Sequence, residues 1–384
     1  MYIQQKQVEN LQQLLAPQKV VVLYGPRRVG KTTLIKNFVA NYRQENPAES
    51  DHILSVNGDD IVVRQHLESQ SLQKLKNFVG DHTLLVIDEA QYIEKIGLNL
   101  KLIVDHVPGI KVIATGSSSF DLAKDIGEPL TGRKYVLKLF PLAQMEISQI
   151  EKLHETVANL ESRLLYGVYP EVVTMSGNAQ RQEYLRELVN SYLMKDILAL
   201  EGIRYSNKLV QLLQLLAFQL GKEASLTELG TQLGMSKNTV ERYLDLLEKV
   251  FVVYSLTGFS RNLRKEISKG RRYYFYDNGI RNALIGNFNP LTLRNDVGEL
   301  WENYVITERM KRQEYLREFT RFYFWRTYDQ KEIDLIEERD GKLYGYEMKW
   351  QKKAAKPPQD WQTSYPEASF QTIHRDNYLE FILK

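Results

Sequence analysis

The chain has 384 residues, of which 43% are hydrophobic and 26% are charged, a balance typical of soluble globular proteins. One compact core rarely serves a chain of this length, so two or three domains are expected. The net charge of +3 permits a nucleic-acid partner without requiring one. The sequence has no cysteine, which excludes disulfides and thiolate metal sites, and its six scattered histidines show no zinc pattern.

The N-terminal stretch MYIQQKQVENLQQLL lacks the apolar segment of a signal peptide. No apolar run in the sequence approaches the roughly 20 residues that a membrane-spanning helix needs. We therefore expect a cytoplasmic protein with no membrane partner.

Residues 18 to about 142 alternate apolar, strand-like runs with helical patterns. Buried strands that alternate with helices are typical of a parallel sheet covered on both faces. We therefore predict an α/β multidomain protein whose first domain, 1–145, is a parallel α/β/α sandwich. The strand-like runs are 19–25, 52–58, 82–90, 109–118 and 134–142.

The pattern changes after this domain. Apolar residues recur at spacings of three and four over 184–200 and 207–220, which predicts helices. Strand–helix alternation resumes from Tyr273. The predicted domains of this part are a helical linker or lid (146–220), a helix-turn-helix unit (221–260) and a C-terminal α/β domain (261–384).

The stretch VVVLYGPRRVGKTTLIKNF holds the pattern Gly-x4-Gly-Lys-Thr between a predicted strand and a predicted helix, as a P-loop requires. Its glycines let the backbone curl so that successive N–H groups point at phosphate oxygens. Lys31 is expected to contact the outer phosphates of ATP, and Thr32 to bind Mg²⁺. The predicted nucleotide-binding residues are Gly25, Pro26, Arg27, Arg28, Val29, Gly30, Lys31, Thr32 and Thr33.

A second motif, HTLLVIDEAQ, ends an apolar strand with two acids. Asp88 is expected to hold Mg²⁺ through water, and Glu89 to activate the attacking water. A small-molecule kinase would not need that glutamate, so the pair indicates hydrolysis of ATP.

Further polar residues flank the neighbouring strands. Thr115, with Ser117 close by, lies in VIATGSSS and is predicted to sense the γ-phosphate, although such residues also form turns. Arg133 precedes the run KYVLKLFPL and is predicted as an arginine finger or sensor, with a plain surface arginine as the alternative.

The segment SLTELGTQLGMSKNTVERYLDLLEKVFVVYSL predicts a helix-turn-helix with a following wing, its second helix capped by Ser236. That helix presents Lys237, Asn238 and Arg242, which suit contact with double-stranded DNA, although such units also serve as lids or interaction surfaces. A basic link follows, which is either a phosphate-binding element or a solvated loop. Its basic residues are Arg261, Arg264, Lys265, Lys269, Arg271 and Arg272.

The chain resembles the AAA+ ATPases, specifically a bacterial and archaeal family related to the STAND switch ATPases. The resemblance spans nearly the whole chain and rests on GPRRVGKTTL, LLVIDEAQ, ATGSSSFDL, LTGR with LFPL, YGVYPEVV and YFYDNGIRNAL. It implies a P-loop ATPase domain joined to a helical region, a winged helix and a C-terminal domain of restriction-endonuclease-like type.

Near the end of the chain, KEIDLIEERDGKLYGYEMKW predicts two strands joined by a turn at Asp340-Gly341. Asp334 lies in the first strand, and Glu347 and Lys349, two residues apart, share one side of the second. Either these side chains are the solvated face of a hairpin or they form a metal-dependent nuclease centre.

This arrangement resembles the PD-(D/E)XK nuclease pattern, with Glu302 as the acid on a preceding helix, DVGELWENYVITERM. The resemblance implies that Asp334 and Glu347, with Glu302 as a further acid, hold Mg²⁺. It also implies that Lys349 orients a water molecule or stabilises developing charge.

We therefore expect an enzyme that binds and hydrolyses ATP with Mg²⁺, acts on double-stranded DNA and carries a nuclease-like C-terminal domain. The alternative is an ATP-driven switch or scaffold whose C-terminal domain binds DNA or a protein partner without cleaving. The sequence leaves open whether the chain forms a homo-oligomer.

Overall fold

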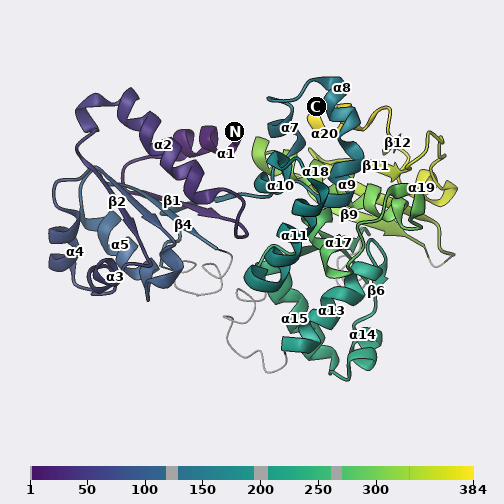
Figure 1. The fold of residues 1–384 in the computed structure, drawn as a ribbon, viewed down its shortest axis with the longest axis horizontal. Helices are drawn as coiled ribbons and strands as arrows, with labels where there is room; N and C mark the ends of the chain where they lie inside the picture. The colour runs from purple at the N-terminus through teal and green to yellow at the C-terminus, as the bar shows by residue number, and fades with distance from the viewer. Residues whose placement is uncertain (1, 118–128, 194–205, 261–269, 328) are drawn as a thin grey trace.

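The computed structural model describes residues 2–117, 129–193, 206–260, 270–327 and 329–384. Two sheets organise this part of the chain, one with five strands and one with seven. Figure 1 shows the five-stranded sheet with its helices on the left and the rest of the chain, with the seven-stranded sheet, on the right. No helix within these described residues is long and apolar enough to cross a membrane.

The first sheet is parallel throughout, as predicted. Its strands are β1 (Lys19–Tyr24), β2 (Ile53–Asn57), β3 (Leu84–Asp88), β4 (Lys111–Gly116) and β5 (Lys134–Lys138). They follow the order β2-β3-β4-β1-β5. Because all of them run the same way, the segments that leave β1, β3 and β4 meet at one edge of the sheet.

Helices cover both faces of this sheet. They are α1 (Gln7–Leu14), α2 (Lys31–Glu45), α3 (Ile61–Leu67), α4 (Leu72–Val79) and α5 (Ile96–His106), with short 3₁₀ turns η1 (Pro47–Glu49) and η2 (Ala90–Tyr92). Val21 and Leu23 of β1 share a core with α1 and α2, whereas Val20 and Val22 share another with α3, α4 and α5. Alternate strand residues point to opposite faces, so the predicted α/β/α sandwich is confirmed.

The described part of the next region is helical. Its elements are α7 (Gln144–Ile147), α8 (Leu153–Ala158), α9 (Leu160–Tyr166), α10 (Pro170–Thr174), α11 (Asn178–Glu187), the π-helical turn η3 (Leu188–Leu193) and α13 (Ser206–Phe218). Proline at the first position of α10 suits a helix start, because that N–H would lack an intrahelical partner anyway.

Two helices joined by a tight turn follow, between short strands. The elements are β6 (Glu223–Ala224), α14 (Leu226–Leu233), α15 (Lys237–Lys249), β7 (Val253–Gly258) and β8 (Arg271–Phe275). Gly234 ends α14 in the left-handed region, with a φ of 58°. Ser236 Oγ accepts from the backbone N–H of Thr239 at 3.2 Å, which confirms the predicted cap of the second helix.

The remaining elements complete the second sheet. They are α17 (Asn278–Leu284), η4 (Leu291–Leu293), α18 (Val297–Leu316), β9 (Arg321–Arg326), β10 (Glu332–Arg339), β11 (Lys342–Met348), α19 (Gln359–Ser364), β12 (Ser369–Ile373) and α20 (Tyr378–Leu383). The sheet order is β12-β11-β10-β9-β7-β8-β6. Asp340 and Gly341, both with positive φ, form the turn between β10 and β11.

The two parts that the sequence analysis separated at residue 260 share this sheet. β7 pairs with β9 in parallel, with Thr257 opposite Tyr323 and Gly258 opposite Phe324. An unpaired edge of β7 would leave backbone N–H and C=O groups without partners, and β9 covers that edge. The helix pair and the C-terminal strands are therefore structurally continuous.

Candidate functional site

The first group of functional side chains surrounds the loop between β1 and α2. The chain leaves β1 at Tyr24 and enters α2 at Lys31, the context that a P-loop needs. Gly30 has a φ of 98°, in the left-handed region that favours glycine. A Cβ at Gly25 would overlap the carbonyl oxygen of Leu139. Both glycines of the motif are therefore required by the backbone.

Lys31 lies against the backbone of this loop. Its side chain is buried, and Nζ donates to the carbonyl oxygens of Gly25 at 2.7 Å and Pro26 at 2.9 Å. These bonds hold the ammonium group where the outer phosphates of a nucleotide bind in P-loop proteins.

Three oxygen-bearing side chains meet at the neighbouring strand ends. Thr32 Oγ1 donates to Asp88 Oδ2 at 2.8 Å, and Thr115 Oγ1 donates to Asp88 Oδ1. The strand order places β4 between β1 and β3, which brings Thr115 beside both. Mg²⁺ prefers hydroxyl, water and carboxylate oxygens, so the donor set of Thr32 and Asp88 fits that ion.

Glu89 follows Asp88 in a left-handed backbone conformation, with a φ of 53°. Its N–H donates to Thr115 Oγ1 at 3.2 Å, and its carboxylate accepts from the side-chain amide of Gln91. Gln91 also accepts from the backbone N–H of Ser117 at 3.3 Å. These bonds fix the direction of the Glu89 carboxylate. Gln91 was not predicted, and its only sequence signal is its place two residues after Glu89.

A cavity of about 190 Å³ opens beside the loop. The N-terminal residues Tyr2, Ile3 and Gln5 form one wall, and Gln5 Nε2 donates to the carbonyl oxygen of Val29 at 2.8 Å. The other lining residues are Gly30, Thr33, Leu142, Pro170, Glu171 and Thr174. Sequence reasoning missed this cavity because three distant segments form it and no motif marks them.

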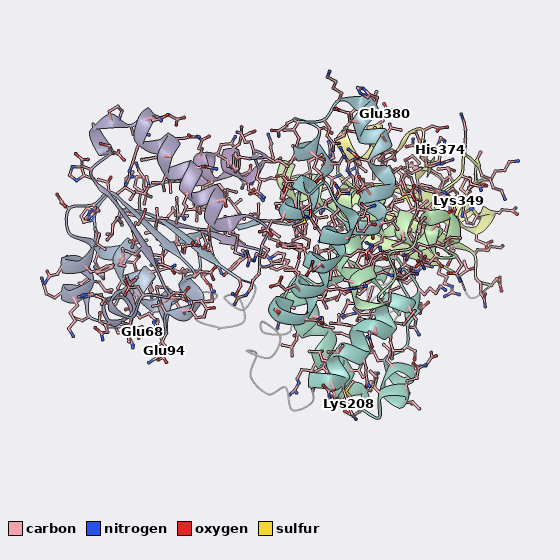
Figure 2. All side chains as sticks on the ribbon, viewed as in Figure 1. Glu68, Glu94, Lys208, Lys349, His374 and Glu380 are labelled. Atoms are coloured by element: carbon pink, nitrogen blue, oxygen red, sulfur yellow. The ribbon has the colours of Figure 1, made fainter. Side chains whose placement is uncertain are left out.

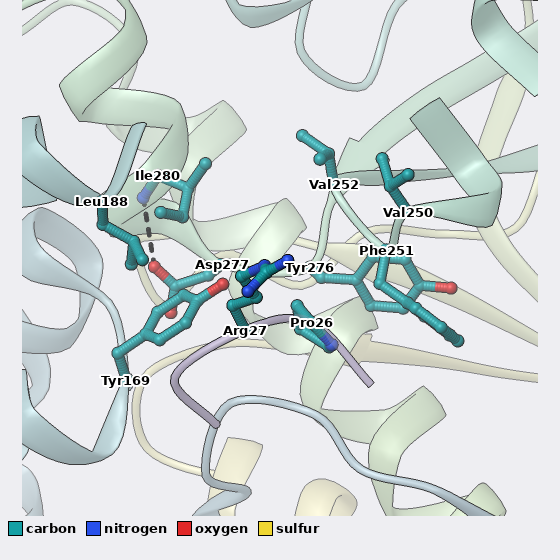
Figure 3. Close-up of a pocket in the computed structure, with 10 residues that line it drawn as sticks. All are labelled: Pro26, Arg27, Tyr169, Leu188, Val250, Phe251, Val252, Tyr276, Asp277 and Ile280. Carbon is teal, nitrogen blue, oxygen red and sulfur yellow. Dashed lines mark hydrogen bonds between the residues drawn. The ribbon is translucent and has the colours of Figure 1, made fainter. Parts of the chain in front are cut away.

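A second pocket, of about 30 Å³, lies between the loop and the C-terminal half of the chain. Figure 3 shows Pro26 and Arg27 of the loop close to Tyr276 and Asp277. Arg27 Nη2 also donates to the hydroxyl of Tyr92 at 3.1 Å. The other lining residues are Tyr169, Leu188, Val250, Phe251, Val252 and Ile280. The loop is therefore in contact with parts of the chain far outside its own domain.

Arg133 lies away from the P-loop. It precedes β5, which runs parallel to β1, so it lies at the edge where these strands begin, whereas the P-loop follows the end of β1. Its Nε donates to Asp105 Oδ1 at 2.6 Å. The prediction of a finger or sensor at the ATP site of the same chain is corrected accordingly, since a whole strand separates the two.

The second group of functional side chains lies in the C-terminal sheet. Asp334 of β10 and Glu347 of β11 flank the cross-strand pair of Leu335 and Tyr346, and Lys349 follows at the end of β11. In Figure 2, Lys349 lies on the side of the molecule opposite Glu68 and Glu94 of the N-terminal domain.

All three side chains line one cleft, of about 560 Å³. The cleft is further lined by Leu220, Gly221, Lys222, Glu223, Arg272, Gly298, Glu299, Glu302, Arg326, Glu332, Met348 and Trp350. The structure therefore brings together the two acids and the lysine that the sequence singled out. We call this space the acidic cleft.

Asp334 is buried at the base of the acidic cleft. Its Oδ2 accepts from the backbone N–H of Met348 at 2.8 Å, and its Oδ1 lies 3.8 Å from Nη1 of Arg272. Burial, together with the nearby Glu347 carboxylate, raises the pKa of Asp334 to about 7.

Glu347 and Lys349 form an ion pair, with Nζ 2.7 Å from Oε1. Burial opposes protonation of the lysine, but the hydrogen bond and the charge of Glu347 outweigh it and raise the pKa of Lys349. Lys349 is thus a cation held at the mouth of the acidic cleft.

Glu302, on α18, accepts a hydrogen bond from the hydroxyl of Tyr274 at 2.7 Å. Burial and the charge of Asp334 raise its pKa well above the ordinary value. Among the described residues, no three histidine, cysteine, aspartate or glutamate side chains are grouped so that they could hold a metal ion. The prediction of Glu302, Asp334 and Glu347 as one ligand set is corrected in this respect, because Tyr274 and α18 hold Glu302 apart.

Arg272 is the residue of the acidic cleft that the sequence analysis misplaced. It was assigned to the solvated basic link, yet it is buried, and its guanidinium pairs with Glu332 as well as facing Asp334. β8 explains the difference, because alternate residues of a strand face opposite sides and Arg271 is the exposed one. The predicted contacts of Arg261, Arg264, Lys265 and Lys269 lie outside the described residues.

The donor set of the acidic cleft fits a hard divalent cation. Two carboxylates from neighbouring strands are available in Asp334 and Glu347, and Mg²⁺ commonly uses only one or two protein carboxylates together with water and substrate phosphate. A third protein acid is therefore not a condition for binding.

The comparisons with known proteins follow the same division of the chain. Residues 17–148 match a family model described as an AAA domain. Residues 157–291 and 297–369 match two domains of unknown function, DUF8612 and DUF4143.

Two relatives were found across most of the chain. An uncharacterized protein of Mycobacterium tuberculosis is 28% identical over 350 residues, which cover 88% of this chain and 72% of that one. An uncharacterized protein of Haemophilus influenzae is 26% identical over 314 residues, with coverages of 76% and 74%.

Among solved structures, the chain is similar to the ORC2 protein of Aeropyrum pernix in ADPNP and ADP complexes, with a TM-score of 0.43, 15% identity and coverages of 74% and 93%. It is also similar to the Aeropyrum pernix ORC1 protein in complex with DNA, with a TM-score of 0.33, 16% identity and coverages of 73% and 91%. The AAA match contains the whole five-stranded sheet and its P-loop, so the N-terminal domain is a P-loop ATPase domain of the AAA class.

Proposed function

We propose that the protein hydrolyses ATP at its P-loop and cleaves phosphodiester bonds of DNA in the acidic cleft with a divalent metal ion. The observation that carries the second half is the meeting of Asp334, Glu347 and Lys349 in one cleft. The first half is supported by the AAA match and by the arrangement of Lys31, Thr32 and Asp88.

In the ATP half, the loop N–H groups and the Lys31 ammonium bind the phosphates. Thr32 and Asp88 would hold Mg²⁺, which screens the charge of the β- and γ-phosphates. Glu89 takes the proton of the attacking water, and the amide of Gln91 keeps its carboxylate aimed. The purine base is accommodated by the 190 Å³ cavity, whose Ile3, Leu142 and Pro170 offer apolar surface.

In the DNA half, Asp334 and Glu347 would hold the metal ion, which polarises the phosphate and lowers the pKa of a bound water. Lys349 stabilises the negative charge that grows on the phosphate oxygens as the water attacks. Arg272 places a second guanidinium charge at the base of the cleft, near the same oxygens.

A route for DNA to this cleft is supported by a neighbouring groove. The groove, of about 690 Å³, is lined by Lys237 of α15 and Arg271 of β8, and it shares Glu223 and Arg326 with the acidic cleft. Asn238 and Arg242, also predicted to contact DNA, are exposed on α15. Contacts of this kind are mainly to phosphates, so we expect DNA affinity to fall steeply with salt.

One observation favours the alternative of a switch that binds without cleaving. Each acid of the cleft already faces a cation of the chain, Asp334 facing Arg272 and Glu347 paired with Lys349. A metal ion has to compete with these charges, whereas a binding-only site has no such competition.

The two functions are separated by a nicking assay on supercoiled plasmid with Mg²⁺ or Mn²⁺, with and without ATP. We expect metal-dependent nicking by the wild type and none by Asp334→Ala, with ATP hydrolysis equal in both. Glu338→Ala is the matched control, because Glu338 lies on the same strand but lines no part of the cleft. If the wild type shows no nicking that Asp334→Ala removes, the switch without cleavage is the better account.

A further inference from the structure

One short strand, β8, runs from the acidic cleft to the P-loop. Arg272 lines the cleft, and Tyr274 behind it donates to Glu302. Tyr276 and Asp277, which follow β8 directly, line the pocket that contains Pro26 and Arg27. Five residues of extended chain separate Arg272 from Asp277, a span of roughly 17 Å.

At the P-loop end, the turn after β8 has little freedom. Asp277 Oδ1 accepts from the N–H of Ile280 at 3.1 Å and caps α17, while Oδ2 accepts from the N–H of Val168 at 2.7 Å. A Cβ at Gly167 would overlap the Asp277 carboxylate, so the two segments are in close contact. The Tyr276 ring stacks on Phe140 at 5.3 Å between ring centroids. A displacement of the loop is therefore passed on by this turn rather than absorbed by it.

In the middle, Asn303 of α18 ties the strand and the helix together. Its Oδ1 accepts from the N–H of Phe275 at 2.8 Å. Its Nδ2 donates to the carbonyl oxygen of Phe275 at 3.0 Å and to Asn278 Oδ1 at 2.7 Å. Three side-chain bonds from one buried residue make the end of β8, the start of α17 and this part of α18 one unit.

At the cleft end, the bond from Tyr274 fixes the residue next to Asn303. The Tyr274 ring is fully buried, and its hydroxyl holds the Glu302 carboxyl, which faces the charge of Asp334 across the cleft. The position of Tyr274 thus sets how near the Glu302 carboxyl lies to Asp334. No other hydrogen bond to the Glu302 side chain is present in the described residues.

We propose that Tyr274 is a positioning residue through which the nucleotide at the P-loop controls the acidic cleft. ATP and ADP differ in the phosphate that the loop encloses, and they set the contact of Pro26 and Arg27 with the Asp277 turn differently. β8 carries that difference to Tyr274 and hence to Glu302. This inference rests on the proposed function of both sites, and the coupling it describes is reciprocal.

The distribution of tryptophan offers a direct readout. The four tryptophans are Trp301, Trp325, Trp350 and Trp361, so none belongs to the ATPase domain, and Trp350 lines the acidic cleft. A change of tryptophan emission on nucleotide binding has to arise in the C-terminal half. Trp350→Phe identifies the part of the change that comes from the cleft.

The experiment titrates a non-hydrolysable ATP analogue at constant Mg²⁺ and follows tryptophan emission. Nucleotide binding is measured separately, by the anisotropy of a fluorescent ATP analogue. In the wild type we expect a Trp350 signal whose midpoint matches that of binding. In Tyr274→Phe we expect nucleotide affinity within about threefold of wild type and loss of the Trp350 signal.

Tyr254→Phe is the matched control. It also removes one buried tyrosine hydroxyl that bonds α18, because Tyr254 OH lies 2.9 Å from Thr307 Oγ1, and the two tyrosine rings are stacked on adjacent strands. Its signal should persist. The proposal is overturned if the wild type binds nucleotide without a Trp350 signal, or if both tyrosine variants lose the signal alike. Failure to bind nucleotide in the anisotropy measurement overturns the ATP assignment as well and so marks a different failure.

Discussion

The P-loop site and the acidic cleft contain the same kinds of side chain but balance their charges differently. In the P-loop site, the printed partners of Lys31 are backbone carbonyls, and those of Asp88 are threonine hydroxyls and a backbone N–H. In the acidic cleft, Asp334 faces the guanidinium of Arg272, and Glu347 pairs with the ammonium of Lys349.

Neutral partners orient a charged group without cancelling its charge, so Lys31 retains its attraction for phosphate and Asp88 for a cation. Charged partners cancel one another, and a ligand must offset the lost ion pairs before it gains anything. The P-loop site is therefore prepared for its ligands, whereas the acidic cleft has to be rearranged by its own. The predictions below run from the largest expected effect to the smallest.

Glu89→Gln should reduce the turnover of ATP by about 10²–10⁴-fold, because the amide cannot take the proton of the attacking water. Affinity for ATP should stay as in the wild type, since the loop is intact. Phosphate release measures the first quantity and nucleotide anisotropy the second. Glu94→Gln, an exposed glutamate five residues later, serves as the control. Equal turnover by wild type and Glu89→Gln would refute the assignment of the base.

Lys31→Ala should weaken nucleotide binding by about 100-fold or more, because one buried charge and its phosphate contacts are lost. Anisotropy of a fluorescent ATP analogue measures the change. Lys36→Ala removes an exposed lysine of the same helix and should have no effect. The comparison of the two sites also requires that Lys349→Ala leave nucleotide affinity unchanged. A loss there would show that the sites are not separate.

The affinity of the acidic cleft for Mn²⁺ should rise about tenfold per pH unit up to pH of about 7 and then level off. The sign follows from the raised pKa of Asp334, about 7, because the carboxyl stays protonated below that pH and a proton has to leave before the metal binds. Calorimetric titration of nucleotide-free protein measures this dependence. In Asp334→Asn the affinity should be low at every pH, and an unchanged pH profile in that variant would remove Asp334 from the site.

Arg133→Ala should change the rate of ATP hydrolysis by less than about twofold, because the side chain pairs with Asp105 at the opposite edge of the sheet. Steady-state phosphate release measures this rate over a range of protein concentrations. A loss of tenfold or more that depends on protein concentration would mean that Arg133 acts at the P-loop of a second copy.

Much of the ATP site was predictable because its parts are neighbours in the chain. The glycines, Lys31 and Thr32 lie in one loop, and the strand before it is a continuous apolar run because both of its faces are buried. Asp334, Glu347 and Lys349 were also found early, since a two-residue turn places β10 against β11 whatever the rest of the fold does.

Other parts of both sites depend on which strands pair, in which direction and against which helix. The direction of β5 places Arg133 at the wrong edge for its own P-loop, and the facing of β8 buries Arg272 instead of Arg271. The bond from Tyr274 to Glu302 joins a strand to a helix that follows it at a distance in the chain. Local periodicity carries no information on such pairings, because hydrophobic burial is non-directional and only the packed chain selects the partners.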